Sequence, residues 1–199
     1  MAARGRARSS LTARSLRQRL ILTAPDGVGG KRLAAALAAG DVAAVVIDLG
    51  PLAPEQVVAI QAGGAAALVA ASAWPAPHGA DGLHLAVDRV SQLRKRPEGA
   101  ICGAHAADRH GAMVIGEAGA DYVWFDGAGD TQAACALGAW WSEMFEVPAV
   151  VAGPSDALAA MIGTRAEFVA MVDAFDGLGD EAALVNAANA ALDAAQEAG

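Results

Sequence analysis

The feature that most constrains the fold is an alternation, repeated along the whole chain, of short apolar runs with alanine-rich segments. This alternation is typical of βα units built around a parallel sheet. Most of the runs are continuously apolar, as expected for strands that are covered on both faces. The sequence predicts eight strands, at 19–24, 43–49, 66–70, 82–85, 100–104, 122–125, 149–152 and 168–172.

Helical segments are predicted after seven of these strands, at 31–39, 54–62, 87–96, 109–118, 131–145, 155–162 and 180–197. The exception is the connection 71–80, which contains Pro75 and Pro77 and is too short for a full helix. We therefore predict an α/β fold, a small (β/α)8 TIM barrel with a vestigial third helix. A doubly wound open sheet is the alternative that periodicity leaves open.

The charge is divided unevenly between the start of the chain and the rest. Six of the 14 basic residues and none of the 22 acidic residues lie in the first 19 positions, so residues 20–199 carry a formal charge of about −14. Such an acidic domain is a poor partner for nucleic acid. We predict a basic flexible tail at 1–18, followed by one barrel domain at 19–199.

The composition indicates a single globular domain without a membrane partner. A chain of 199 residues with 55% hydrophobic residues can bury one large core. No apolar run reaches the about eighteen residues that a membrane helix needs. Cys102 and Cys135 predict neither a disulfide framework nor a metal knuckle, and the start does not read as a secretory signal. We expect a cytoplasmic protein, and assembly into a homo-oligomer is left open.

Four strings resemble those of thiamine-phosphate synthases and their thiazole tautomerase relatives. Residues 79–85 read Gly-Ala-Asp-Gly-Leu-His-Leu, close to the family's Gly-Ala-Asp-Gly-Val-His-Leu, and 119–123 read Gly-Ala-Asp-Tyr-Val. Residues 148–153 and 168–173 resemble the family's seventh and eighth strands. The resemblance covers roughly 20–192 and implies a barrel with its site at the C-terminal ends of the strands. There the family joins a pyrimidine pyrophosphate to a thiazole phosphate, releases pyrophosphate and uses Mg²⁺.

Several positions that bind anions in the family hold other residues here. Asp48 lies at the end of the second predicted strand, where the resemblance implies an arginine and a lysine. The segment 69–72 lacks an implied Asn-Asp pair, and the loop 126–130 lacks the implied lysine that would neutralise pyrophosphate. Gly153 and Pro154 replace a Gly-Gly pair of the phosphate loop, and proline has no backbone N–H to donate.

Positions that the resemblance assigns to serine and histidine also differ. His105 stands at an implied serine, Ala107 at an implied histidine, and Gly127 at the histidine of the tautomerase relatives. Asp173 replaces the serine after the last strand, where a carboxylate would repel a phosphate. We therefore predict a divergent thiamine-phosphate-synthase-like protein of thiamine biosynthesis or salvage, with the family's usual site eroded. The alternatives are a tautomerase-like acid–base enzyme and a non-catalytic ligand-binding or regulatory barrel.

The candidate site residues follow from their places at or after the ends of the predicted strands. His105, His84 and Asp48 are the catalytic candidates, because imidazole and carboxylate groups can transfer protons at neutral pH. No compact ligand motif predicts a resident metal, and Mg²⁺ is expected only if the family reaction is retained. The partner is expected to be a small thiamine-related molecule. The substrate-binding candidates are Asp126, Gly153, Ser155 and Asp173.

Overall fold

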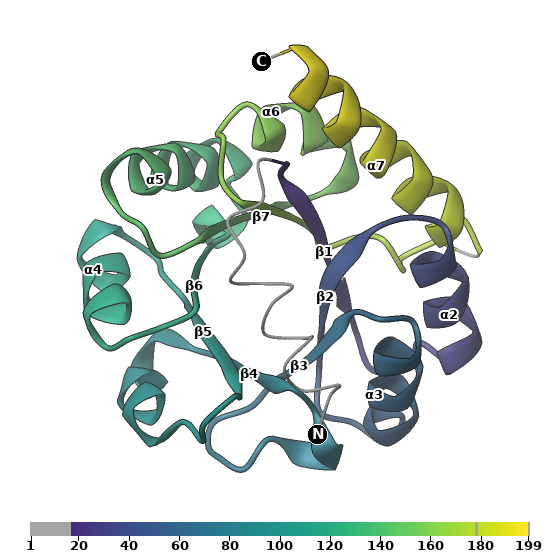
Figure 1. Cartoon of the computed structure of the whole chain (residues 1–199), viewed down its shortest axis with the longest axis horizontal. Helices are drawn as coiled ribbons and strands as arrows, with labels where there is room; N and C mark the ends of the chain where they lie inside the picture. The colour runs from purple at the N-terminus through teal and green to yellow at the C-terminus, as the bar shows by residue number, and fades with distance from the viewer. Residues whose placement is uncertain (1–16, 178, 199) are drawn as a thin grey trace.

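The computed structural model describes residues 17–177 and 179–198, and its strands form a closed parallel barrel in the order β1 to β8 (Figure 1). This confirms the predicted barrel and excludes the open sheet. All of the predicted strand bounds are correct to within two residues. The strands are β1 (Arg19–Ala24), β2 (Val42–Ile47), β3 (Ala66–Ala70), β4 (Gly82–Leu85), β5 (Ile101–His105), β6 (Tyr122–Phe125), β7 (Ala149–Gly153) and β8 (Phe168–Met171).

The interior of the barrel is filled by side chains from alternate positions of the strands. Tyr122, Trp124 and Phe168 are its large members, and most of the rest are alanine, valine, leucine or isoleucine. Gly103 makes room for the ring of Tyr122, since a Cβ at Gly103 would lie 2.3 Å from that ring. The interior is therefore a packed core, and ligands have access only at the ends of the strands.

Helices surround the barrel on its outer side (Figure 1). The third connection holds only the short 3-10 turn η1 (Pro77–Gly79), so the prediction of a vestigial third helix is confirmed. In the described residues, no helix has both the length and the apolar character needed to cross a membrane. The α-helices are α2 (Gly30–Ala38), α3 (Ala53–Ala62), α4 (Arg109–Glu117), α5 (Thr131–Met144), α6 (Leu158–Ile162) and α7 (Glu181–Ala198).

One predicted helix has no α-helical part. The segment 87–96 was expected to be an ordinary helix, but it is the 3-10 segment η2 (Val87–Lys95). Leu93 is its one buried residue, and its first residue has no side-chain cap. This segment buries little apolar surface. Tertiary packing would therefore stabilise a full α-helix here only weakly.

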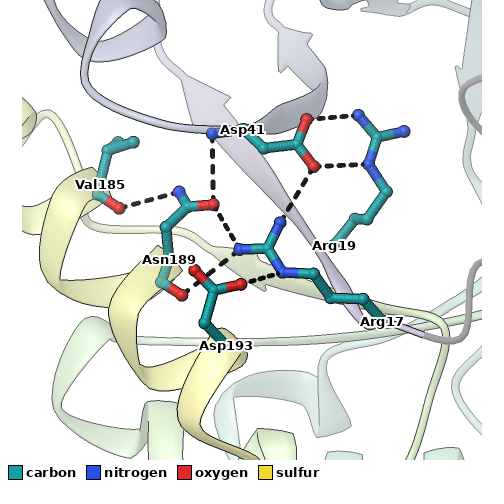
Figure 2. Close-up of polar contacts among 6 residues, drawn as sticks. All are labelled: Arg17, Arg19, Asp41, Val185, Asn189 and Asp193. Carbon is teal, nitrogen blue, oxygen red and sulfur yellow. Dashed lines mark hydrogen bonds and ion pairs between the residues drawn. The ribbon is translucent and has the colours of Figure 1, made fainter. Parts of the chain in front are cut away.

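A polar cluster fastens the last helix to the first strands at the N-terminal end of the barrel (Figure 2). Arg19 donates two hydrogen bonds to the carboxylate of Asp41, at 2.8 and 2.6 Å. Arg17 forms ion pairs with Asp41 at 3.3 Å and with Asp193 at 2.6 Å. Arg17 also donates to Oδ1 of Asn189 at 3.0 Å, and the same oxygen accepts the backbone N–H of Asp41 at 3.2 Å.

Two residues that come just before the predicted barrel domain in the sequence form contacts with this domain. Arg17 belongs to the cluster above, and Gln18 donates a hydrogen bond to the backbone oxygen of Ala166 at 2.7 Å. Residues 1–16, which form most of the predicted basic tail, lie outside the described residues.

Candidate functional site

An open cavity of about 690 Å³ lies at the C-terminal ends of the strands, where the sequence predicted a site. His84 of β4 and His105 of β5 both line it. These strands are neighbours in the barrel and run parallel, so their C-terminal side chains lie close together. Most of the other lining residues are apolar, among them Leu49 and Ala70. Ser72 and Arg89 also line the cavity.

His105 forms a hydrogen-bonded pair with Asp126. Nε2 of His105 lies 2.7 Å from Oδ1 of Asp126, which follows β6. The same carboxylate oxygen accepts the backbone N–H of Ala128 at 2.8 Å, and this bond fixes the orientation of the carboxylate. With Nε2 directed at Asp126, Nδ1 is the ring nitrogen of His105 that is left for a ligand. A histidine oriented by a carboxylate is a common arrangement for proton transfer.

His84 forms a second pair, with Tyr122. Nδ1 of His84 lies 2.9 Å from the hydroxyl oxygen of Tyr122, a fully buried residue inside the barrel. The edge of the Trp124 ring packs against His84, with 4.9 Å between the ring centroids. Burial lowers the pKa of His84 to about 4, and nearby His105 acts in the same direction while Asp126 opposes it. His84 is therefore neutral at pH 7.

The loop after β7 is occupied by a carboxylate of the protein itself. Asp173 accepts hydrogen bonds from the backbone N–H of Ser155 at 2.8 and 3.0 Å and from its hydroxyl at 2.8 Å. Gly153 is buried at the end of β7, and Pro154 follows it with no N–H of its own. The structure thus brings together three of the four predicted substrate-binding residues, Gly153, Ser155 and Asp173, whereas Asp126 lies beside His105.

Two curated proteins resemble this chain in sequence, and no family model matches it. The thiamine-phosphate synthase of Erythrobacter litoralis is 40% identical over an alignment of 126 residues, and the match covers 54% of this chain and 57% of that protein. The thiamine-phosphate synthase of Rhodospirillum centenum is 36% identical over an alignment of 141 residues, and the match covers 61% of this chain and 68% of that protein. This chain belongs to the thiamine-phosphate synthase family. Its match spans little more than half the length of the Erythrobacter protein.

A solved structure agrees with this family in its fold. The thiamine phosphate pyrophosphorylase of Pyrococcus furiosus superposes with a TM-score of 0.74, over 94% of this chain and 98% of that one. Only 16% of the residues are identical, so this likeness concerns the barrel and not the chemistry of its mouth.

Asp48, a predicted catalytic residue, is exposed after the end of β2. The cavity lining includes its neighbour Leu49 but not Asp48, and no hydrogen bond or ion pair joins Asp48 to either histidine within the described chain. The structure therefore pairs His105 with Asp126, and not with Asp48.

The described residues at the mouth of this thiamine-phosphate synthase relative hold no ready-made cluster of metal ligands. In the part of the chain that the structure describes, no three His, Cys, Asp or Glu side chains are close enough together to hold a metal. Asp126 and Asp173 already accept hydrogen bonds from His105 and Ser155. Mg²⁺ usually relies on one or two carboxylates together with substrate phosphates, so it would depend here on a phosphorylated ligand.

Sequence reasoning missed Tyr122 and Trp124 as partners of His84. A signal for them is present in β6, because side chains two residues apart in a strand lie on the same face. Tyr122, Trp124 and Asp126 share this spacing, so the choice of Asp126 as a site residue implies that the two aromatic residues also face the barrel interior.

Proposed function

We propose that this chain is a divergent thiamine-phosphate-synthase-like protein whose ligand is a thiamine-related heterocycle without a phosphate group. The observation that carries this proposal is the contact of the Asp173 carboxylate with the N–H and hydroxyl of Ser155. Loops at this end of a barrel commonly bind phosphate through such donors. Here the donors already have an anionic acceptor.

A phosphate at this loop would have to displace Asp173 or lie beside it. Two like charges 4 Å apart repel by about 1 to 4 kcal/mol for effective dielectric constants between 80 and 20. Pro154 cannot supply a substitute N–H. An alcohol or an amine avoids this repulsion, because either group can donate a hydrogen bond to Asp173.

Three arginines in the first turns of helical segments around the mouth also have partners within the protein. Arg32 of α2 pairs with Glu181 at 3.0 Å, and Arg109 of α4 lies over the ring of Trp140 at 4.7 Å. Arg89 lines the cavity and pairs with its neighbour Asp88 at 3.2 Å. A leaving pyrophosphate needs preorganised cations, so this arrangement favours a protein in which the family's condensation is weak.

The His105 and Asp126 pair favours a second candidate function, a tautomerase-like acid–base reaction. Asp126 fixes the ring of His105, while Nδ1 can exchange a proton with a ligand in the cavity. A third candidate function, ligand binding without a reaction, would use the same cavity. Assays for product formation distinguish a purely ligand-binding protein from the two enzymatic functions.

The family condensation supplies the first test. Purified protein is incubated with pyrimidine pyrophosphate, thiazole phosphate and Mg²⁺, next to an active thiamine-phosphate synthase under the same conditions. We expect thiamine phosphate to form at no more than about a hundredth of the control rate, which is the size of effect that loss of one group stabilising a transition-state charge has. A rate equal to that of the control would overturn the proposal.

Ligand binding supplies the second test. Calorimetric titration of the thiazole alcohol and of its phosphate ester should show the alcohol binding at least about fivefold more tightly, the ratio that 1 kcal/mol of repulsion produces. The variant Asp173→Asn keeps the size of the side chain without its charge and should reduce this preference. Tighter binding of the phosphate ester by the wild-type protein would contradict the proposal.

A further inference from the structure

The pair of half-buried His84 and fully buried Tyr122 has two ways to share its protons. Either the Tyr122 hydroxyl donates to Nδ1 of His84, or a proton on Nδ1 is donated to the Tyr122 oxygen across the same 2.9 Å. In the first arrangement the imidazole proton lies on Nε2, and in the second it lies on Nδ1. The two tautomers present different groups to the cavity.

Both groups are neutral at pH 7. Burial lowers the pKa of His84 to about 4 and raises the pKa of the Tyr122 hydroxyl well above its ordinary value. The pair therefore holds two protons, one on the phenol and one on the imidazole. Only their placement is undecided.

The packing around Tyr122 decides between the two arrangements. The ring fits closely against Gly103 and lies in the apolar interior cluster of the barrel. In the described part of the chain, the hydroxyl has no hydrogen-bond partner other than His84. If Nδ1 carried the proton, the hydroxyl proton would be left buried without an acceptor, which destabilises the folded protein. The hydroxyl therefore donates, and Nδ1 accepts.

We infer that Tyr122 holds His84 as the neutral Nε2–H tautomer, so that His84 is a hydrogen-bond donor to a ligand in the cavity. Tyr122 is a positioning residue, since it acts on the ligand only through His84. His84 lines the cavity beside His105, whose Nε2 is directed at Asp126. The two histidines thus have different roles, a fixed neutral donor and a group oriented for proton exchange.

This assignment deepens the proposed function and rests on it for the identity of the ligand. A fixed N–H donor selects a ligand group with a free lone pair, such as an aromatic ring nitrogen. It does not favour a group that can only donate. The unphosphorylated thiazole, whose ring nitrogen is an acceptor, meets this requirement.

The tautomer can be measured without any ligand. Long-range ¹H–¹⁵N correlation spectra of the full chain at pH 7 report which nitrogen of each histidine carries the proton. The chain has four histidines, so His84→Gln assigns the His84 signals by their loss. We expect Nε2–H for His84 in the wild type, and at least a severalfold rise of the Nδ1–H form in Tyr122→Phe. A wild-type His84 protonated on Nδ1, or a tautomer ratio unchanged in Tyr122→Phe, would overturn the inference. The wild-type spectrum decides the assignment even if the variant does not fold.

Thiazole binding tests the consequence for the cavity. Tyr122→Phe should weaken binding of the thiazole alcohol about threefold to tenfold, the usual effect of losing one hydrogen bond. His84→Gln, which keeps an N–H donor, should bind more tightly than His84→Ala. Equal binding by the wild type and Tyr122→Phe would refute the donor role. Failure of the wild type to bind thiazole would refute the proposed ligand class, while the spectra would still decide the tautomer.

Discussion

At the scale of single residues, Gly103 shows how closely the barrel interior is filled. A Cβ at this position would meet three atoms of the Tyr122 ring at 2.3 to 2.4 Å. The ring cannot move away easily, because it is fully buried and its hydroxyl is bonded to His84. The absence of a side chain at Gly103 is therefore part of what places Tyr122 beside His84.

We expect Gly103→Ala to lower the free energy of unfolding by about 1–3 kcal/mol, as overpacking of a core generally does. Gly29→Ala is the matched control, since no atom lies within 4 Å of a Cβ there. This control should change stability by less than about 0.5 kcal/mol. Urea denaturation of both variants measures the difference, and equal losses would show that the interior adjusts to the extra methyl group.

At the scale of elements, the attachment of α7 depends on Asn189. Its side-chain oxygen accepts hydrogen bonds from Arg17 and from the backbone N–H of Asp41, and its amide donates to the backbone oxygen of Val185 (Figure 2). A Cβ at Gly40 would lie 2.4 Å from the Asn189 amide nitrogen, so the turn before β2 approaches the helix closely. Asn189 thereby connects the last helix to the start of the barrel.

Replacing Asn189 with Ala should cost about 1–3 kcal/mol of stability, because it leaves the part-buried N–H of Asp41 and the Arg17 guanidinium without the acceptor that the buried Asn189 supplies. Asn186→Ala, at an exposed position of the same helix, should have an effect within about 0.5 kcal/mol. Guanidinium denaturation compares the two variants. A similar small effect for both would mean that apolar packing alone holds α7 in place.

At the scale of the whole molecule, two carboxylates connect the last helix to the beginning of the barrel. Asp41 belongs to the Arg17 and Arg19 cluster, and Glu181 at the start of α7 pairs with Arg32 of α2. The hydrogen bond from Arg19 lowers the pKa of Asp41 below its ordinary 3.8, and that from Arg32 lowers the pKa of Glu181 below 4.5. Both carboxylates therefore favour the folded state only while they are ionised.

Stability should consequently depend on pH on the acid side. A carboxylate whose pKa is lowered in the folded state stabilises it above the unfolded pKa, and this stabilisation is lost as the pH falls through the folded pKa. We expect the free energy of unfolding to fall below about pH 4.5. Asp41→Asn and Glu181→Gln should each make this fall shallower, whereas exposed Glu197→Gln should not. Denaturation series between pH 7 and pH 3 measure these slopes, and identical slopes in all variants would contradict the assignment.

Much of this protein follows from local sequence alone. Continuous apolar runs and alanine-rich segments repeat in a way that is typical of βα units. The barrel, its strands and the lack of a full helix after β3 were therefore predictable. Parallel strands of one barrel end at the same edge, so residues at the ends of predicted strands, such as His84, His105 and Asp126, could be expected to lie near one another. The form of the segment 87–95 was not predictable in this way, because it depends on how little of that segment is buried.

The pairing of the site residues was decided by the tertiary structure. His84 bonds to Tyr122 across 38 positions of sequence, and Ser155 bonds to Asp173 across 18. Such pairs depend on the register between strands and on how deeply each side chain lies in the interior. Neither of these can be inferred from the local pattern of residues. Hydrogen bonds and the burial of charge are set by the atoms that surround a group in the folded protein. For this reason the sequence indicated candidate residues near the mouth, whereas the fold alone determined which of them contact one another.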